Sequence, residues 1–259
     1  MISWLSNWRR KRIEAEPFAA EHREVLSAQW SAWDALTPDS RAKLENLVKV
    51  FVHEKEFEGC RGLKVTDAMK VLIAAQACML ILNKPGEVFP LCDTVLVYPE
   101  KFTRVQKSIG PGGLVTETDV VVSGESWNGL WGGGSGGPVV LSWADVVLGA
   151  QGLDGRNVVY HEFAHQLDGL NGAMDGVPAL GDKTAEMDFA KAMGTEFSIL
   201  RQQIARGGPL SMHPYGGTHP AEFFAVGTEK YFGMAEQGQH EDSNWTKHMD
   251  RVYGFEVQA

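Results

Sequence analysis

The sequence predicts an α+β fold, because helical patterns near both ends of the chain enclose a stretch of short β-strands. Two helices are expected between Thr37 and Leu82, and helical patterns return after Gly155. The residues between them contain short β-branched runs separated by glycine and proline, as sheet strands are. A chain that passes from helices to strands and back to helices is typical of an α+β domain.

The first two helices are marked by the residues that precede them. Thr37 is a capping residue followed by proline, and apolar residues then recur at helical spacing to an expected end near Gly59. Thr66 caps a second helix, which is apolar almost without interruption over residues 68–82. We expect this second helix to be buried on most sides.

The remaining elements are predicted from their composition. The β-branched runs expected to form strands are residues 94–98, 119–123 and 138–142. The later helices are expected at residues 157–170, 184–205, 220–232 and 244–253. The glycine-rich segment 132–137 is not followed by the Gly-Lys-Ser/Thr of a phosphate-binding loop, so we interpret it as the tip of a hairpin.

The charge of the chain bears on its partners. A formal net charge of −9 over 259 residues repels phosphate backbones and disfavours direct nucleic-acid binding. The one basic patch, residues 9–12, follows Trp4, Leu5 and Trp8, a combination that suits an anionic membrane surface or a partner. We instead expect residues 1–19 to form a solvated, poorly ordered basic tail.

No signal peptide is expected, because no apolar segment follows a positively charged start as it does in signal peptides. No membrane span is expected either, because no apolar stretch reaches about 18 residues. The three cysteines, Cys60, Cys78 and Cys92, are an odd number without CxxC spacing. This spacing argues against both a disulfide framework and a cysteine zinc site. We therefore expect buried thiols in a cytoplasmic protein.

A His-Glu-x-x-His motif lies within the helix expected at residues 157–170. Histidines four residues apart lie on one helix face, so His161 and His165 can bind one tetrahedral zinc ion, with Glu162 directed at a zinc-bound water. The flanking residues are apolar, and a buried helix would carry these polar groups at high cost unless they were paired or bound to metal. The motif therefore predicts a zinc site with Glu162 as the general base.

A catalytic zinc site needs a third protein ligand. The metzincin pattern is excluded, because Asp168 and Asn171 stand where that class has glycine and histidine. We prefer Glu222, which lies near the start of a later helix, although the same residue would also suit a capping box with its own backbone. His213 and His219 are the alternative ligands.

Two more carboxylates lie on the faces that carry these residues. Asp168, three residues after His165, is either an acceptor for the spare N–H of a ligand histidine or a plain surface aspartate. Glu229, seven residues after Glu222, is the second candidate for the acceptor role.

Four segments form a joint pattern that is more specific than the histidine motif. They are residues 161–168, Asn171-Gly172, Gly176-Val177-Pro178 and the stretch 215–226. Together they resemble the Mlc titration factor A family of bacterial zinc peptidases, and a looser similarity extends over residues 36–253. The resemblance implies a zincin-like catalytic domain, which we place at residues 86–259, after an N-terminal helical region at residues 20–85.

The resemblance also implies roles for individual residues. His161, His165 and Glu222 would be the zinc ligands, Glu162 would be catalytic and Tyr215 would lie in the site. Peptidase activity of the aminopeptidase type on a peptide or protein substrate follows from the same family. The glycine-rich segment and the basic patch depart from the family pattern.

Two other functions compete with the peptidase. The enterobacterial member binds a transcriptional repressor, so the first rival is a regulatory binding protein that sequesters a transcription factor and keeps zinc for structure. Glu162 argues against this rival, because a structural zinc site needs no base. The second rival is a metal hydrolase that acts on something other than peptides, since water activation is common to both.

Overall fold

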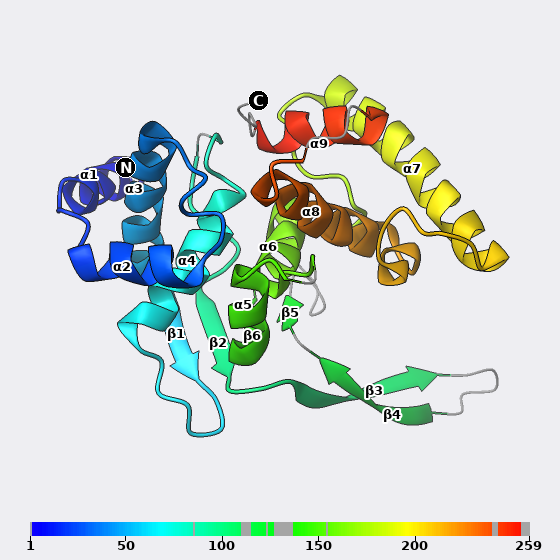
Figure 1. Ribbon diagram of the computed structural model, residues 1–259, viewed down its shortest axis with the longest axis horizontal. Helices are drawn as coiled ribbons and strands as arrows, with labels where there is room; N and C mark the ends of the chain where they lie inside the picture. Colours follow the sequence, from blue (N-terminus) through cyan, green and yellow to red (C-terminus); the bar gives the residue numbers. More distant parts are fainter. Residues whose placement is uncertain are drawn as a thin grey trace.

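The computed structural model describes residues 2–84, 86–109, 115–122, 124–126, 137–153, 155–239 and 243–254. Its helices form two groups, with α1 to α4 on one side and α6 to α9 on the other, and a small sheet lies beside both groups (Figure 1). The predicted α+β fold is confirmed. The boundaries proposed between tail, helical region and catalytic domain stay predictions.

The N-terminal helices are α1 (Ile2–Glu14), α2 (Ala20–Gln29), α3 (Pro38–Glu54) and α4 (Asp67–Met79). Thr37 caps α3 and Thr66 caps α4, as predicted, and α4 is buried along most of its length. Helix α3 ends before the expected Gly59, because the chain enters strand β1 (Glu56–Gly59) and pairs with the next strand.

The basic N-terminal segment is helical, so the expectation of a poorly ordered tail was wrong. Arg10 of α1 donates two hydrogen bonds, of 2.8 and 2.9 Å, to the carboxylate of Glu54 at the end of α3. Ile13, three residues further on and therefore on the same helix face, is buried. The Arg10–Glu54 ion pair thus links α1 to α3, and Ile13 joins the apolar core.

The main sheet has the strand order β1-β2-β6-β5. Its further strands are β2 (Thr94–Tyr98), β6 (Val139–Ser142) and β5 (Gly124–Ser126). The first three strands in this order run parallel, and β5 pairs antiparallel with β6. Two of the three predicted strands are therefore confirmed as β2 and β6, and helix α5 (Trp143–Ala150) follows β6 directly.

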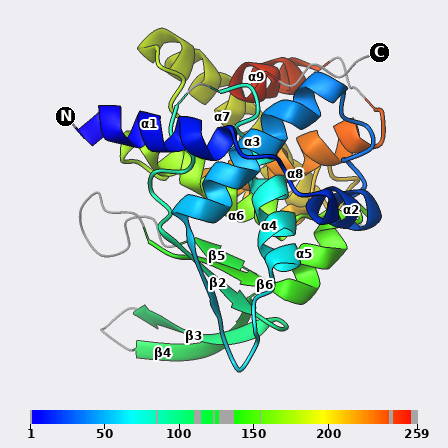
Figure 2. The same cartoon turned by 90° about the vertical axis from the view of Figure 1, so that its left-hand side faces the viewer.

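The third predicted strand belongs to a separate hairpin. Strands β3 (Phe102–Ile109) and β4 (Val115–Val122) pair only with each other in the described part of the chain, and they extend away from the helices (Figures 1 and 2). Local composition predicts a strand but does not say which strand it pairs with. Residues 132–136 lie outside the described residues, so the hairpin tip expected there stays a prediction.

Helix α6 (Val158–Asp168) lies at the centre of the molecule. Its Phe163 packs against Phe51 of α3 and against Phe89, with ring centroids 5.5 and 4.7 Å apart. The later helices are α7 (Lys183–Arg206), α8 (Pro220–Glu236) and α9 (Asn244–Tyr253), close to their predicted bounds. Buried apolar residues form one cluster that joins the N-terminal helices to α6, α8 and α9. The histidine motif is therefore held from both sides.

Candidate metal centre

Both motif histidines project from α6, whose first turn is fixed by Asn157. The Asn157 side chain accepts a hydrogen bond from the N–H of Tyr160 at 3.0 Å, as a capping residue does. The rings of His161 and His165 lie one helical turn apart, with centroids separated by 4.9 Å. A buried apolar face on the same helix sets the direction in which these rings point.

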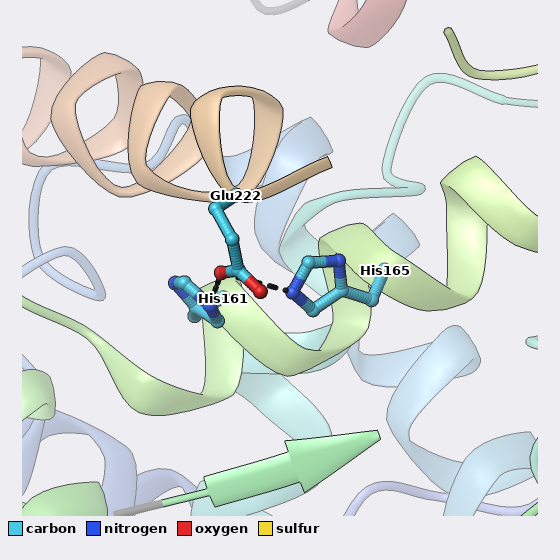
Figure 3. Close-up of side chains that lie close together, drawn as sticks. All are labelled: His161, His165 and Glu222. Atoms are coloured by element: carbon cyan, nitrogen blue, oxygen red, sulfur yellow. Dashed lines mark hydrogen bonds and ion pairs between the residues drawn. The ribbon is translucent and has the colours of Figure 1, made fainter. Parts of the chain in front are cut away.

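Glu222 comes from the first turn of α8. His219 caps this helix by accepting the N–H of Ala221, and Pro220 occupies the first turn. The carboxylate of Glu222 extends toward the two histidines of α6 (Figure 3), rather than toward its own helix end. Glu222 Oε2 lies 3.0 Å from His161 Nε2 and 3.5 Å from His165 Nε2.

The three donor atoms fit a metal ion. Ligand atoms of His161, His165 and Glu222 all lie within 4.8 Å of one another. Bonds of about 2.0–2.2 Å in a tetrahedral zinc site place neighbouring ligand atoms about 3.3 Å apart. Two imidazoles and one carboxylate are also a ligand set that zinc sites use.

The hydrogen bonds of His161 also suit a metal ligand. Its Nδ1 lies 2.7 Å from Glu229 Oε1, and a carboxylate accepts, so Nδ1 donates. A neutral His161 then presents a lone pair at Nε2, which faces the Glu222 oxygen at 3.0 Å. Two acceptors at this distance repel each other unless a proton or a metal ion lies between them.

The charges at the site shift the pKa values of these groups. Burial alone would lower the pKa of His161, but its hydrogen bonds to Glu222 and Glu229 raise it well above the usual value. Burial alone would raise the pKa of Glu222, but His161 and His165 hold it well below the usual range. The carboxylates and His161 thus favour each other's charged forms.

Glu162 is buried beside the first histidine. Burial raises its pKa to about 8, Glu222 and Glu229 add to the rise, and His161 opposes it. A carboxyl group whose pKa lies near neutrality can both accept and return a proton.

The two predicted acceptor carboxylates have different positions. Glu229, the second candidate, contacts the ring of His161. Asp168, the first candidate, is buried and not on the surface, and both of its oxygens accept the N–H of Gly176 at 3.0 Å. The sequence analysis named both carboxylates, but it preferred Asp168 as the partner of a ligand histidine, and the structure shows Glu229 in contact with His161.

Tyr215 lies near His161. It belongs to the short helix η3 (Pro214–Gly217), and its ring centroid is 6.0 Å from that of His161. Tyr215 is 49% exposed. The alternative ligands His213 and His219 both use Nδ1 to accept a backbone N–H at the start of a helix.

Comparison with known proteins shows the family of the chain. Residues 5–254 match the model of a family described as glucose-regulated metallo-peptidase M90. The chain belongs to this family. M90 membership makes the protein a metallopeptidase, and the residues that fit its metal ion are those of α6 and α8 described above.

Individual relatives match most of the chain. An uncharacterized protein of Synechocystis sp. is 35% identical over 98% of this chain and 90% of its own length. Mlc titration factor A of Klebsiella pneumoniae is 33% identical over 78% of this chain and 74% of its own length. The protein of that name from Yersinia pestis is 30% identical over 91% of this chain and 83% of its own. The resemblance drawn from the sequence is therefore confirmed.

The described residues contain no helix that is both long and apolar enough to cross a membrane.

Two residues that support the site, Asn157 and Gln76, were missed by sequence reasoning. The position of Asn157 at the start of a predicted helix was a signal for a cap. No sequence signal pointed to Gln76, which lies in a mostly apolar helix.

Proposed function

We propose that this metallopeptidase uses zinc, held by His161, His165 and Glu222, and that Glu162 is its general base. The observation that carries the proposal is the convergence of three ligand atoms from two buried helices beside Glu162. When bound, zinc would supply a water of lowered pKa and polarise the scissile carbonyl. Glu162 accepts the proton of that water and passes it to the leaving amine.

The first test separates metal binding from proton transfer. Glu162→Gln should retain metal and fold but lose most peptidase activity, because an amide cannot accept the proton. Metal content, thermal unfolding and cleavage of a peptide library are measured on the same tag-free preparation. Wild-type cleavage by the variant would reject Glu162 as the base, and absence of zinc after reconstitution would reject the zinc site.

We also propose that Tyr215 donates a hydrogen bond to the oxygen of the substrate carbonyl. Loss of one such donor typically costs about 2.7–4 kcal/mol in the transition state. Tyr215→Phe should therefore bind zinc and unfold normally, while kcat falls about 100-fold or more. An unchanged kcat would remove Tyr215 from the catalytic residues, and a loss of stability instead would give it a packing role.

We extend the proposal to aminopeptidase-type cleavage, which the family resemblance supports. A matched pair of peptides, one with a free and one with an acetylated amino terminus, tests this point. An aminopeptidase cleaves the free peptide and leaves the acetylated peptide intact. Equal cleavage of both would indicate an endopeptidase with the same metal site.

The cytoplasm is the proposed location. The three cysteines are free thiols, which is the usual state in a reducing compartment. Fractionation of the native cells followed by immunodetection tests this assignment.

The name Mlc titration factor A, carried by two of the relatives, supports a second function, the binding of a transcriptional repressor. A binding surface and a general base are separate requirements. Glu162→Gln should therefore bind the purified repressor as tightly as the wild type does. Absence of binding by either protein would reject this second function and leave the peptidase proposal intact.

A further inference from the structure

A line of buried polar groups runs from the metal centre to helix α4. Glu229 of α8 accepts Nδ1–H of His161 with one oxygen at 2.7 Å and the backbone N–H of Asn157 with the other, also at 2.7 Å. The side-chain amide of Asn157 donates to Gln76 Oε1 at 2.8 Å. Gln76 in turn donates to the carbonyl of Leu72, one turn earlier in α4.

These groups lie deep in the protein. Gln76 is 0%, Asn157 5% and Glu229 8% exposed. Gln76 is surrounded by apolar neighbours on α4, where a polar side chain costs free energy unless its hydrogen bonds are made. The position therefore has a specific polar function, since an apolar residue would pack there without this cost.

The order of donors and acceptors along the line is fixed. The backbone N–H of Asn157 can only donate, so Glu229 meets it as an acceptor and meets His161 as an acceptor as well. Nδ1 of His161 must then carry the proton, which leaves the lone pair on Nε2, the atom nearest Glu222. Asn157 Oδ1 is committed to capping α6, so its amide nitrogen faces Gln76.

We propose that Glu229, Asn157 and Gln76 form a relay that positions His161 for the metal, so that α4 of the N-terminal region helps to set the metal affinity of the site. The inference rests on the ligand role of His161 proposed above. In this relay Glu229 is a positioning residue that selects the tautomer of His161. Asn157 and Gln76 keep α6 and α8 in fixed positions relative to each other.

The first experiment measures zinc affinity by competition with a chelator, using the full-length, tag-free protein after metal removal. Glu229→Gln keeps the shape of the side chain but places an amide NH₂ against either Asn157 N–H or His161 Nδ1. The first contact opposes two donors, and the second moves the imidazole proton to Nε2. Loss of such a partner lowers metal affinity by about 10- to 100-fold, and this is the result expected.

The second experiment tests the distant end of the relay. Gln76→Met conserves volume but removes the acceptor of the Asn157 amide, which should weaken zinc binding by about 2- to 30-fold. The same variant is decisive if Glu229→Gln fails to fold. The visible spectrum of bound cobalt(II) gives an independent readout, because it changes with the orientation of the imidazole ligand.

Thr228→Val is the matched control for both variants. Thr228 is fully buried on α8, next to Glu229, and its hydroxyl is bonded to the Tyr253 hydroxyl at 2.7 Å. The control should lose stability and retain wild-type zinc affinity and the wild-type cobalt spectrum. An equal loss of affinity in the control would overturn the relay, because general loosening of α8 would then be sufficient.

The remaining outcomes separate failure of the relay from failure of the proposed metal site. Wild-type zinc affinity in a folded Glu229→Gln would overturn the relay, and wild-type affinity in Gln76→Met would overturn its extension to α4. His161→Ala tests the underlying ligand assignment in the same assay. If that variant bound zinc as tightly as the wild type, the proposed metal site itself would fail, whatever the relay variants showed.

Discussion

The two ends of α6 each place a histidine near a buried carboxylate, but the two carboxylates have different roles. At the first end, Glu229 of α8 contacts the ring of His161 directly. At the last end, Asp168 accepts a backbone N–H from Gly176, eight residues further along the chain. One carboxylate orients a ring and the other anchors a loop.

Both ends nevertheless connect α6 to α8. The loop anchored by Asp168 brings the backbone of Gly176 against the carbonyl of Pro220, in the first turn of α8. Glu222 lies in the same turn. The separation of the two helices is therefore fixed at two points, through a side chain at one end and through close backbone packing at the other.

The largest expected effect comes from removing the imidazole rings of both His161 and His165. The double variant His161→Ala/His165→Ala should contain no zinc after reconstitution, because a single carboxylate is not a sufficient ligand set. Elemental analysis of the tag-free protein measures this result. His53→Ala, which removes an exposed histidine outside the site, is the control and should retain the metal. Retention of zinc by the double variant would refute the site.

The next effect tests the backbone contact at the second end. Gly176 has φ of 80°, and a Cβ there would collide with the Pro220 carbonyl. Gly176→Ala should therefore lose about 2–4 kcal/mol of unfolding free energy, from left-handed strain and overpacking together. Because the collision displaces the turn that carries Glu222, zinc affinity should fall as well.

Gly172→Ala is the matched control for this variant. Gly172 has φ of 87° but no atom within 4 Å of an added Cβ, so only the conformational strain applies. Its cost should be about 1 kcal/mol, with unchanged zinc affinity. Equal losses in the two variants, measured by urea unfolding, would show that the contact with Pro220 does not matter.

Much of the fold was predictable because its signals are local. Capping threonines, helical spacing and β-branched runs depend on neighbouring residues, and they located α3, α4, α8, β2 and β6. Pairing is not local. The run at residues 119–123 has the composition of a sheet strand, yet β4 pairs with β3 in a separate hairpin. The basic segment was misjudged for the same reason, since Arg10 finds its partner Glu54 on another helix.

The candidate site divides in the same way. The spacing of His161 and His165 fixes their common helix face, so this part of the site was predictable from the sequence. The role of Glu229 depends on how α8 packs on α6, and the role of Asp168 depends on the path of the following loop. Residue spacing puts both carboxylates on suitable helix faces. Only three-dimensional contacts show which of them orients a histidine ring.

The smallest expected effect concerns the charge of Asp168. Burial raises its pKa from 3.8 to about 6, although the hydrogen bonds from Gly176 oppose the rise. A folded-state pKa above the unfolded value means that the protonated form is favoured by folding, so stability is lost as pH rises from about 4 to about 6. This difference corresponds to at most about 3 kcal/mol.

Asp168→Asn separates the charge from the hydrogen bond. The amide oxygen still accepts the N–H of Gly176, so the metal-free variant should match the wild type near pH 4 and exceed its unfolding free energy by about 1–3 kcal/mol at pH 7. Asp168→Ala removes the acceptor and should be about 1–3 kcal/mol less stable than Asp168→Asn at both pH values, because neither variant titrates at this position. Urea unfolding of the three proteins at pH 4, 5, 6 and 7 measures these differences. If Asp168→Asn were less stable than the wild type at pH 7, the carboxylate charge would itself stabilise the loop, and the second end of α6 would depend on charge as the first end does.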